Sequence, residues 1–224
     1  VEKEYAAVTF LALAAQQFRE IRSMERDSLD SIDKTELVPR GSDYIEDIAK
    51  TFEARNYISM VTALSVSLAV YLTKNVTAGI AMGALVFAAV VYSIRGQKVG
   101  DIARVVKAEI SFEGPLLKVD GVVLMNVGLL EAREKYLTRA LAVRIIPNDD
   151  NARATLGNVG QRQAIAHNAA TQLGIRKDLD EPEFTPIARR NTESGDIVFA
   201  VFSFEPDIEC LIEAIEKTPV LESS

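Results

Sequence analysis

An apolar stretch at residues 57–94 constrains this chain more than any other feature. Its sequence is YISMVTALSVSLAVYLTKNVTAGIAMGALVFAAVVYSI, in which Lys74 is the only charged residue. Lys74-Asn75 divides the stretch into two apolar runs, and the second run would reach about 28 Å as a helix, close to the roughly 30 Å hydrocarbon core of a bilayer. We therefore predict a transmembrane helical hairpin. A pair of buried helices in a soluble protein is the alternative, because five Ser and Thr residues make the first run only moderately apolar.

Small residues recur along both predicted helices. Gly79 and Gly83 form a GxxxG pattern, and Ser59, Ala63 and Ser67 repeat at the same interval of four residues. This spacing places a smooth stripe on each helix, along which another helix backbone can approach closely. We expect these residues to pack helices together, within a homo-oligomer or with other membrane proteins.

Basic residues flank the apolar stretch and predict its orientation. Two precede it and four follow it, against one lysine at the turn: Lys50 and Arg55, then Arg95, Lys98, Arg104 and Lys107. Positively charged loops stay on the cytoplasmic side of a membrane. The pattern predicts a multi-pass protein of the cell membrane, with both flanks in the cytoplasm.

Composition excludes several other functions. The chain has a net charge of −7, which argues against binding nucleic acid. It has one cysteine, Cys210, which excludes an intrachain disulfide framework and a Cys-rich zinc site. The sequence opens with Val1 rather than Met, so we expect a portion of a longer protein with further spans upstream.

Residues 1–56 predict a cytoplasmic helical segment. A helix over about 3–30 is either the continuation of an earlier span or a surface helix, and the pattern does not decide between them. Residues 37–42, LVPRGS, match an engineered thrombin-cleavage cassette, although they can equally be native. Ser42 is expected to cap a helix over 43–56. The apolar face of that helix carries Tyr44, Ile45, Ile48, Ala49 and Phe52.

Residues 98–224 predict one cytoplasmic α+β domain. Two strands, 105–114 and 116–127, are expected around the Gly114-Pro115 turn. Further helices are expected at 129–141, 159–173 and from Pro206, and further strands at 142–147, 184–190 and 196–203. The last two strands flank a five-residue connection, 191–195, typical of a β-hairpin.

The best candidate for a binding site is a glycine-bearing turn at the start of a predicted helix. It comprises Gly157, Asn158, Gly160, Gln161 and Arg162. Free N–H groups at a helix start attract anions, and an arginine adds a bidentate contact to phosphate or carboxylate. The alternative is a plain turn that only connects two elements.

No other residues form a recognisable catalytic or metal-binding set. His167 is the only histidine and lacks a nearby Ser or Cys at a catalytic spacing. Cys210 lies on the last predicted helix and is expected to be a small residue of the hydrophobic core. An acidic run lacks the spacing of a calcium-binding loop, so we expect a solvated loop there. Its residues are Asp178, Asp180, Glu181 and Glu183. We therefore predict no catalytic residues, no metal and no cofactor.

Several stretches resemble the YIEGIA family, membrane proteins found mainly in endospore-forming Gram-positive bacteria. The family is named after a sequence motif, which we call the name motif. It stands here as Tyr44-Ile45-Glu46-Asp47-Ile48-Ala49, with Asp47 in place of the family glycine. The stretches 12–22 (ALAAQQFREIR), 160–165 (GQRQAI) and 182–190 (PEFTPIARR) are also similar. The resemblance implies that LVPRG is native, that further spans precede Val1, and that the protein is linked to sporulation. It implies no chemistry.

These features together predict a non-enzymatic integral membrane protein with a cytoplasmic domain for interaction or assembly. The alternative is a membrane-attached regulator or enzyme that binds a small anionic ligand at the turn 157–162.

Overall fold

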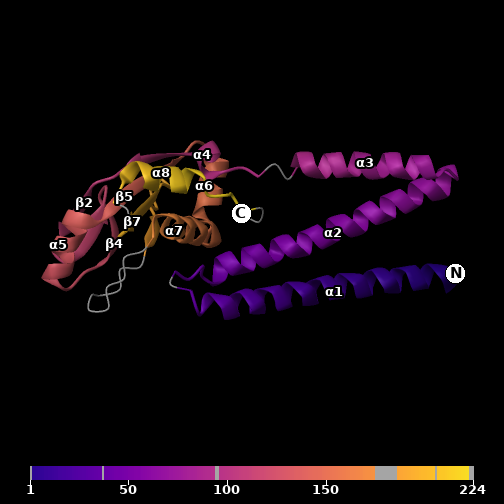
Figure 1. Ribbon diagram of the computed structural model, residues 1–224, viewed down its shortest axis with the longest axis horizontal. Coiled ribbons are helices and arrows are strands. Elements are labelled where there is room, and N and C mark those ends of the chain that lie inside the picture. The colour runs from indigo at the N-terminus through magenta and orange to yellow at the C-terminus, as the bar shows by residue number, and fades with distance from the viewer. Residues whose placement is uncertain (1, 37, 94–95, 175–185, 205, 222–224) are drawn as a thin grey trace. The chain divides into compact units, whose positions relative to one another are not determined.

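The structure is a computed structural model that describes residues 2–36, 38–93, 96–174, 186–204 and 206–221 (Figure 1). It has an α+β fold with two antiparallel sheets, which confirms the α+β part of the predicted fold class. The chain divides into two compact units. A helical unit comprises residues up to 31 together with 46–96, and a globular unit comprises 32–45 together with 97 onward.

The helical unit contains three helices: α1 (Glu2–Asp33), α2 (Ser42–Thr73) and α3 (Val76–Ser93). No break separates the predicted helix 43–56 from the apolar run that follows, so α2 is one helix of 32 residues. Its N-terminal half contacts α1. Arg22 of α1 pairs with Glu46 and, at 3.0 Å, with Glu53 of α2. The ring of Phe18 packs edge-on against Tyr57, with centroids 5.2 Å apart.

The glycines of α3 lie against valines of α2. Gly79 is buried, and a Cβ added there would overlap Val70. A Cβ added at Gly83 would lie 3.3 Å from Val66. The two helices therefore approach closely next to the Lys74-Asn75 turn, as Figure 1 shows.

The small residues of α2 do not meet these glycines. Ser59 and Ala63 line an apolar hollow of about 620 Å³ together with Phe87 and Val90, while Ser67 is exposed. The stripes on the two helices thus do not pack against each other.

Apolar side chains of α2 and α3 remain largely exposed. Leu68, Leu72, Ile80 and Leu85 are 57–69% exposed. The side-chain hydroxyls are satisfied inside the helix, because those of Ser59, Thr62, Ser65 and Thr73 donate to the carbonyl four residues earlier. Among the described residues, α2 alone is both long and apolar enough to cross a bilayer, and Val76–Val90 of α3 is a shorter apolar helix.

The globular unit contains both sheets. The larger sheet has the antiparallel order β1 (Ala103–Lys107), β5 (Leu141–Pro147), β7 (Ile197–Val201), β6 (Ile187–Arg190). The smaller sheet joins β2 (Ile110–Glu113), β3 (Leu116–Val119) and β4 (Val122–Asn126). The helices are α4 (Val99–Ile102), α5 (Leu130–Arg139), α6 (Asp150–Gly157), α7 (Val159–Leu173) and α8 (Ile208–Glu216).

The larger sheet is covered on both faces. One face packs against α7 and α8 through residues such as Ile165, Leu211 and Ile215. The other face packs against β3 and α5, where Leu117 and Tyr136 are buried. This arrangement explains why every residue of the central strand β7 is apolar and buried.

Four short strands occupy the region where we predicted two long ones. After Lys107 the chain leaves the larger sheet, and Glu109 N donates to the carboxylate of Asp120 at 2.9 Å. Asp120-Gly121, with φ of 46° and 80°, then turns β3 into β4. Asp-Gly is a strong signal for such a two-residue hairpin turn, and it was overlooked in the predicted strand 116–127.

One helix of the globular unit was not predicted, and one prediction about this unit was wrong. The segment after Asn148 forms helix α6, because the carboxylate of Asp149 accepts from Ala152 N at 2.7 Å and caps it. Cys210 is exposed rather than in the core. It lies on the outer side of α8, whose inner side carries Leu211, Ala214 and Ile215.

Two side chains hold the start of α2 and the residues just before it. Gln163 of α7 accepts from Tyr44 N at 2.9 Å, and the carboxylate of Asp33 accepts from Arg40 N at 2.6 Å. Ser42 is the first residue of the helix and not its cap, because Ile45 N donates to the carbonyl of Gly41. The predicted N-cap was therefore misplaced by one residue.

Candidate functional site

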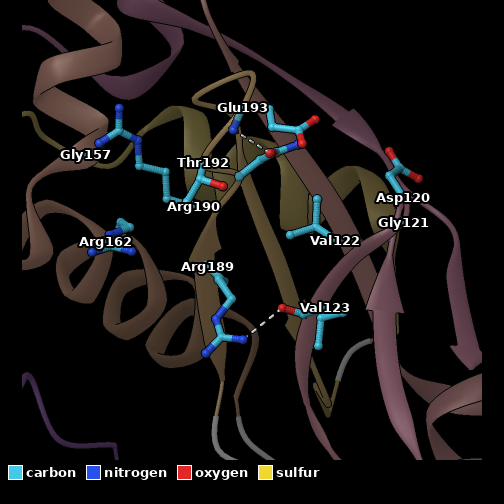
Figure 2. A pocket seen from close by; sticks show the side chains of 11 residues that line it. Asp120, Gly121, Val122, Val123, Gly157, Arg162, Arg189, Arg190, Thr192 and Glu193 are labelled. Atoms are coloured by element: carbon cyan, nitrogen blue, oxygen red, sulfur yellow. Dashed lines mark hydrogen bonds between the residues drawn. The ribbon is translucent and has the colours of Figure 1, made fainter. Parts of the chain in front are cut away.

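A pocket of about 780 Å³ lies in the globular unit where three segments meet (Figure 2). The first is the β3–β4 turn with the start of β4, residues 120–123. The second is the junction of α6 and α7, which contributes Gly157 and Arg162. The third is the end of β6 with the following loop, residues 189–193. Three arginines therefore line one cavity: Arg162, Arg189 and Arg190.

Only two of the five residues predicted at the turn line this pocket, Gly157 and Arg162. Asn158 caps α7, since its side-chain oxygen accepts from Gly160 N at 2.7 Å. Gln161 is fully buried, where it donates to the carbonyl of Pro219 and accepts from Leu221 N. Within the first turn of α7, the N–H group of Gly160 is thus bonded to the protein itself. The anion site at this turn stays a prediction, and the pocket places the side chains of Arg189 and Arg190 beside two of its residues.

Arg162 is held in an electrostatically unfavourable position. Its Nε is buried and has no hydrogen-bond partner within the described residues. Burial, and next the charge of Arg190, lower the pKa of Arg162 below the ordinary value for arginine. Both causes disfavour the charged form, so an anion placed between the two guanidinium groups would relieve them.

Gly157 gives Arg190 room to lie across the α6–α7 junction. A Cβ at position 157 would lie 3.0 Å from Nη1 of Arg190. Arg189, the preceding residue, donates from Nη1 to the carbonyl of Val123 at 3.0 Å and so ties β6 to β4. Figure 2 shows both side chains on the same side of the pocket as Arg162.

The hairpin after β6 completes the pocket. Arg190 pairs with Ile197 in the β6–β7 register, and Asn191 N donates to the carbonyl of Asp196 at 2.7 Å. The side chain of Asn191 accepts from Glu193 N at 2.9 Å, which fixes the loop. The predicted hairpin connection is thus present, although it has six residues, 191–196, instead of five, and it contributes Thr192 and Glu193 to the wall.

None of the three pocket arginines forms an ion pair among the residues that the structure describes. The nearby carboxylate of Asp196 is bound to Arg144 at 2.5 Å, and Asp120 lies 3.8 Å from the same arginine. Arginine groups without carboxylate partners, in a cavity of this size, can bind phosphate or carboxylate through paired N–H donors.

Arg189, Arg190 and the loop residues were not predicted as part of the site. Consecutive arginines directly before a turn signal were visible, but nothing local shows that they face Arg162. Asp120 and Gly121 were likewise visible only as part of a strand.

The other residues singled out in the sequence lie outside this pocket. Nδ1 of His167 is 3.0 Å from the carbonyl oxygen of Val38, and its ring lies near Tyr44. The acidic run 178–183 lies outside the described residues. In the part of the chain that is described, no three His, Cys, Asp or Glu side chains are placed to hold a metal ion.

Comparison with known proteins gives a consistent result over the full length. The family model described as YIEGIA protein matches residues 1–224. The chain belongs to the YIEGIA family. A relative from Bacillus subtilis (strain 168), described as the uncharacterized protein YphB, is 38% identical over 224 residues, which are 100% of this chain and 75% of the relative. No solved structure matches the chain.

Residues from three of the stretches that resemble the YIEGIA family lie in the globular unit of this YIEGIA protein, whereas the stretch 12–22 lies in the helical unit. Tyr44 of the name motif is bonded to Gln163 of the GQRQAI stretch. Arg162 of that same stretch shares the pocket with Arg189 and Arg190, which end the PEFTPIARR stretch. Helix α7 therefore contacts the start of α2 through Gln163 and the pocket through Arg162.

Proposed function

We propose that this YIEGIA protein is a membrane-attached regulator whose globular unit binds a small anionic ligand in the arginine pocket. The observation that carries this proposal is that Arg162 and Arg190 line the same cavity and neither has a carboxylate partner among the described residues. Like charges that share a cavity without counter-ions are unfavourable unless a ligand of opposite charge compensates them.

Attachment to the membrane through α2 and α3 is part of this proposal. It is supported by the length and apolarity of α2, by exposed residues such as Leu72 and Leu85, and by helix hydroxyls bonded to their own backbone. In a bilayer such backbone bonding removes the need for water. A span by α3, which at 18 residues reaches about 27 Å, would complete a multi-pass hairpin in the cell membrane.

The cytoplasm is the proposed location of the globular unit. Lys50, Arg55, Lys98, Arg104 and Lys107 flank the two helices, whereas Lys74 alone lies at their connection. This asymmetry favours both flanks on the cytoplasmic side. The family resemblance suggests a sporulating cell as the setting.

A second candidate function is assembly without any ligand, with the globular unit as a non-enzymatic interaction domain. It is favoured by exposed leucines at α5: Leu129, Leu130 and Leu137 are 63%, 75% and 57% exposed. A cluster of exposed apolar residues often marks a surface that contacts another protein.

The two candidates differ in whether an anion stabilises the protein. The full chain in detergent is heated with inorganic phosphate, sulfate or citrate, and Tm is measured. An anion regulator shows a rise in Tm that is lost in Arg162→Gln and Arg190→Gln, and kept in the control Arg139→Gln on the exposed end of α5. No rise with any anion would leave assembly as the better proposal.

A further inference from the structure

We infer that the arginine pocket binds a phosphorylated polyol of the sugar-phosphate class, with the phosphate at Arg162 and Arg190 and the hydroxyl groups toward Glu193 and Asp120. This inference rests on the proposed anion-binding function and names its ligand. The residues at one end of the pocket support the phosphate group of this ligand, and those at the other end support its hydroxyl groups.

The charge at one end of the pocket favours a dianion. Arg162, Arg189 and Arg190 bring three positive charges into one cavity, and no ion pair with a described carboxylate neutralises them. A phosphate monoester carries about −1.5 to −2 charges at pH 7 and has three acceptor oxygens, whereas a carboxylate carries one charge and two oxygens. Phosphate therefore matches the arginine end better than a single carboxylate does.

The donors at this end also suit several acceptor oxygens. The buried Nε of Arg162 has no described partner, and Arg190 reaches the site across Gly157. Arg189 uses Nη1 for the carbonyl of Val123 and keeps its other N–H groups. Guanidinium groups on two different elements can thus contact different oxygens of one phosphate.

The opposite side of the pocket offers acceptors. Figure 2 shows Asp120 away from the arginines, beyond Val122, with Glu193 on the loop above. The carboxylate of Glu193 and the Thr192 hydroxyl can accept hydrogen bonds from ligand hydroxyls, and the Asp120 carboxylate, which already accepts from Glu109 N, has further lone pairs for the same purpose. A second anionic group on the ligand would be repelled here, which disfavours a dicarboxylate or a diphosphate that spans the pocket.

The floor of the pocket is aliphatic. Val122 and Val123 line it, and of the described lining residues none is aromatic. A nucleobase usually stacks on an aromatic ring, whereas the C–H groups of a sugar can lie on valines. The volume of about 780 Å³ is within the range of small-molecule sites. A sugar phosphate therefore fits better than a nucleotide.

The test compares dissociation constants for the full chain in detergent, measured by calorimetry. The probes are a hexose 6-phosphate, a pentose 5-phosphate, glycerol phosphate, the unphosphorylated hexose, inorganic phosphate, citrate and adenosine monophosphate. We expect at least one of the three polyol phosphates to bind about tenfold or more tightly than inorganic phosphate, since its hydroxyls add hydrogen bonds to charged groups. The unphosphorylated hexose should not bind measurably.

Variants of the lining residues test which end of the pocket binds the phosphate and which end binds the hydroxyl groups. Arg162→Gln and Arg190→Gln should abolish binding of both the polyol phosphate and inorganic phosphate. Glu193→Gln should weaken only the polyol phosphate, by about threefold to tenfold, and Arg139→Gln should change neither. If citrate or the nucleotide binds more tightly than every polyol phosphate, or if no polyol phosphate exceeds inorganic phosphate, the ligand class is overturned while anion binding stands. If no anion binds at all, the proposed function falls with it.

Discussion

The ring Nδ1 of His167 on α7 lies 3.0 Å from the carbonyl oxygen of Val38, which is 129 residues earlier in the chain. Together with the bond from Tyr44 N to Gln163, this contact fixes residues 38–44 on the globular unit. The same segment contains Pro39, Arg40 and Gly41 of the LVPRGS stretch. The segment is therefore held by tertiary contacts, unlike the exposed linker that an inserted cassette would form.

We predict that thrombin cleaves slowly after Arg40 in the folded protein and faster after mild denaturation. The His167→Ala variant removes the contact with Val38, so it should be cut faster than wild type under native conditions and should lose about 1 kcal/mol of stability. The measurement is the rate of appearance of the two fragments. Thr171→Ala, one turn further along α7, is the control, because its hydroxyl bonds only to the carbonyl of His167. Rapid cleavage of the wild type would contradict a docked segment.

Gly41 should not tolerate a side chain. Its φ is 87°, which costs a non-glycine residue roughly 1–2 kcal/mol. A Cβ would also lie 2.6 Å from the carboxamide carbon of Gln163, the residue that binds Tyr44 N. We expect Gly41→Ala to lower Tm clearly, whereas Gly128→Ala, with open space around its Cα, should change it little. Equal Tm values for the two variants would show that the protein does not need a residue without a side chain at position 41.

Charge placement tests the proposed membrane span. Leu85 lies near the middle of α3 and is 65% exposed, and an ionised residue at a bilayer centre costs on the order of 3 kcal/mol on insertion scales. Leu85→Arg should therefore reduce the membrane-inserted fraction, whereas Asn75→Arg at the helix connection should not. The readout is the fraction resistant to carbonate extraction. The same inserted fraction for both variants would argue against a span.

Alkaline pH tests the burial of Tyr136. Its ring packs against Phe202 at 4.7 Å, and burial raises the pKa of its hydroxyl. As pH rises above about 10, the usual value for tyrosine, the unfolded chain ionises first, so stability present at lower pH is lost. Tyr136→Phe removes this ionisation from both states. We expect Tm of the wild type to fall more steeply between about pH 9 and 11 than Tm of the variant, and parallel falls would contradict the burial effect.

Local patterns in the sequence were enough to predict most helices of this protein. The apolar runs around Lys74-Asn75, the helix near 130–139 and the helix after Pro206 are all present at close to the expected bounds. Helical periodicity and turn residues act over a few positions, so a single segment contains its own evidence. The hairpin loop between β6 and β7 was predictable for the same reason to within one residue, as 191–195 against the observed 191–196.

The pocket was decided by tertiary structure. Arg162 starts a helix and Arg190 ends a strand, and they share a cavity only because β6 joins the far edge of the larger sheet beside α7. The start of α2 was decided in the same way, since Gln163 satisfies Tyr44 N from 119 residues away. Long-range pairing depends on how sheets and helices pack, which no local spacing encodes. The sequence by itself therefore determined most of the helical segments, although not α6, and it indicated where an anion site was to be sought. Packing alone determined which arginines meet in one cavity.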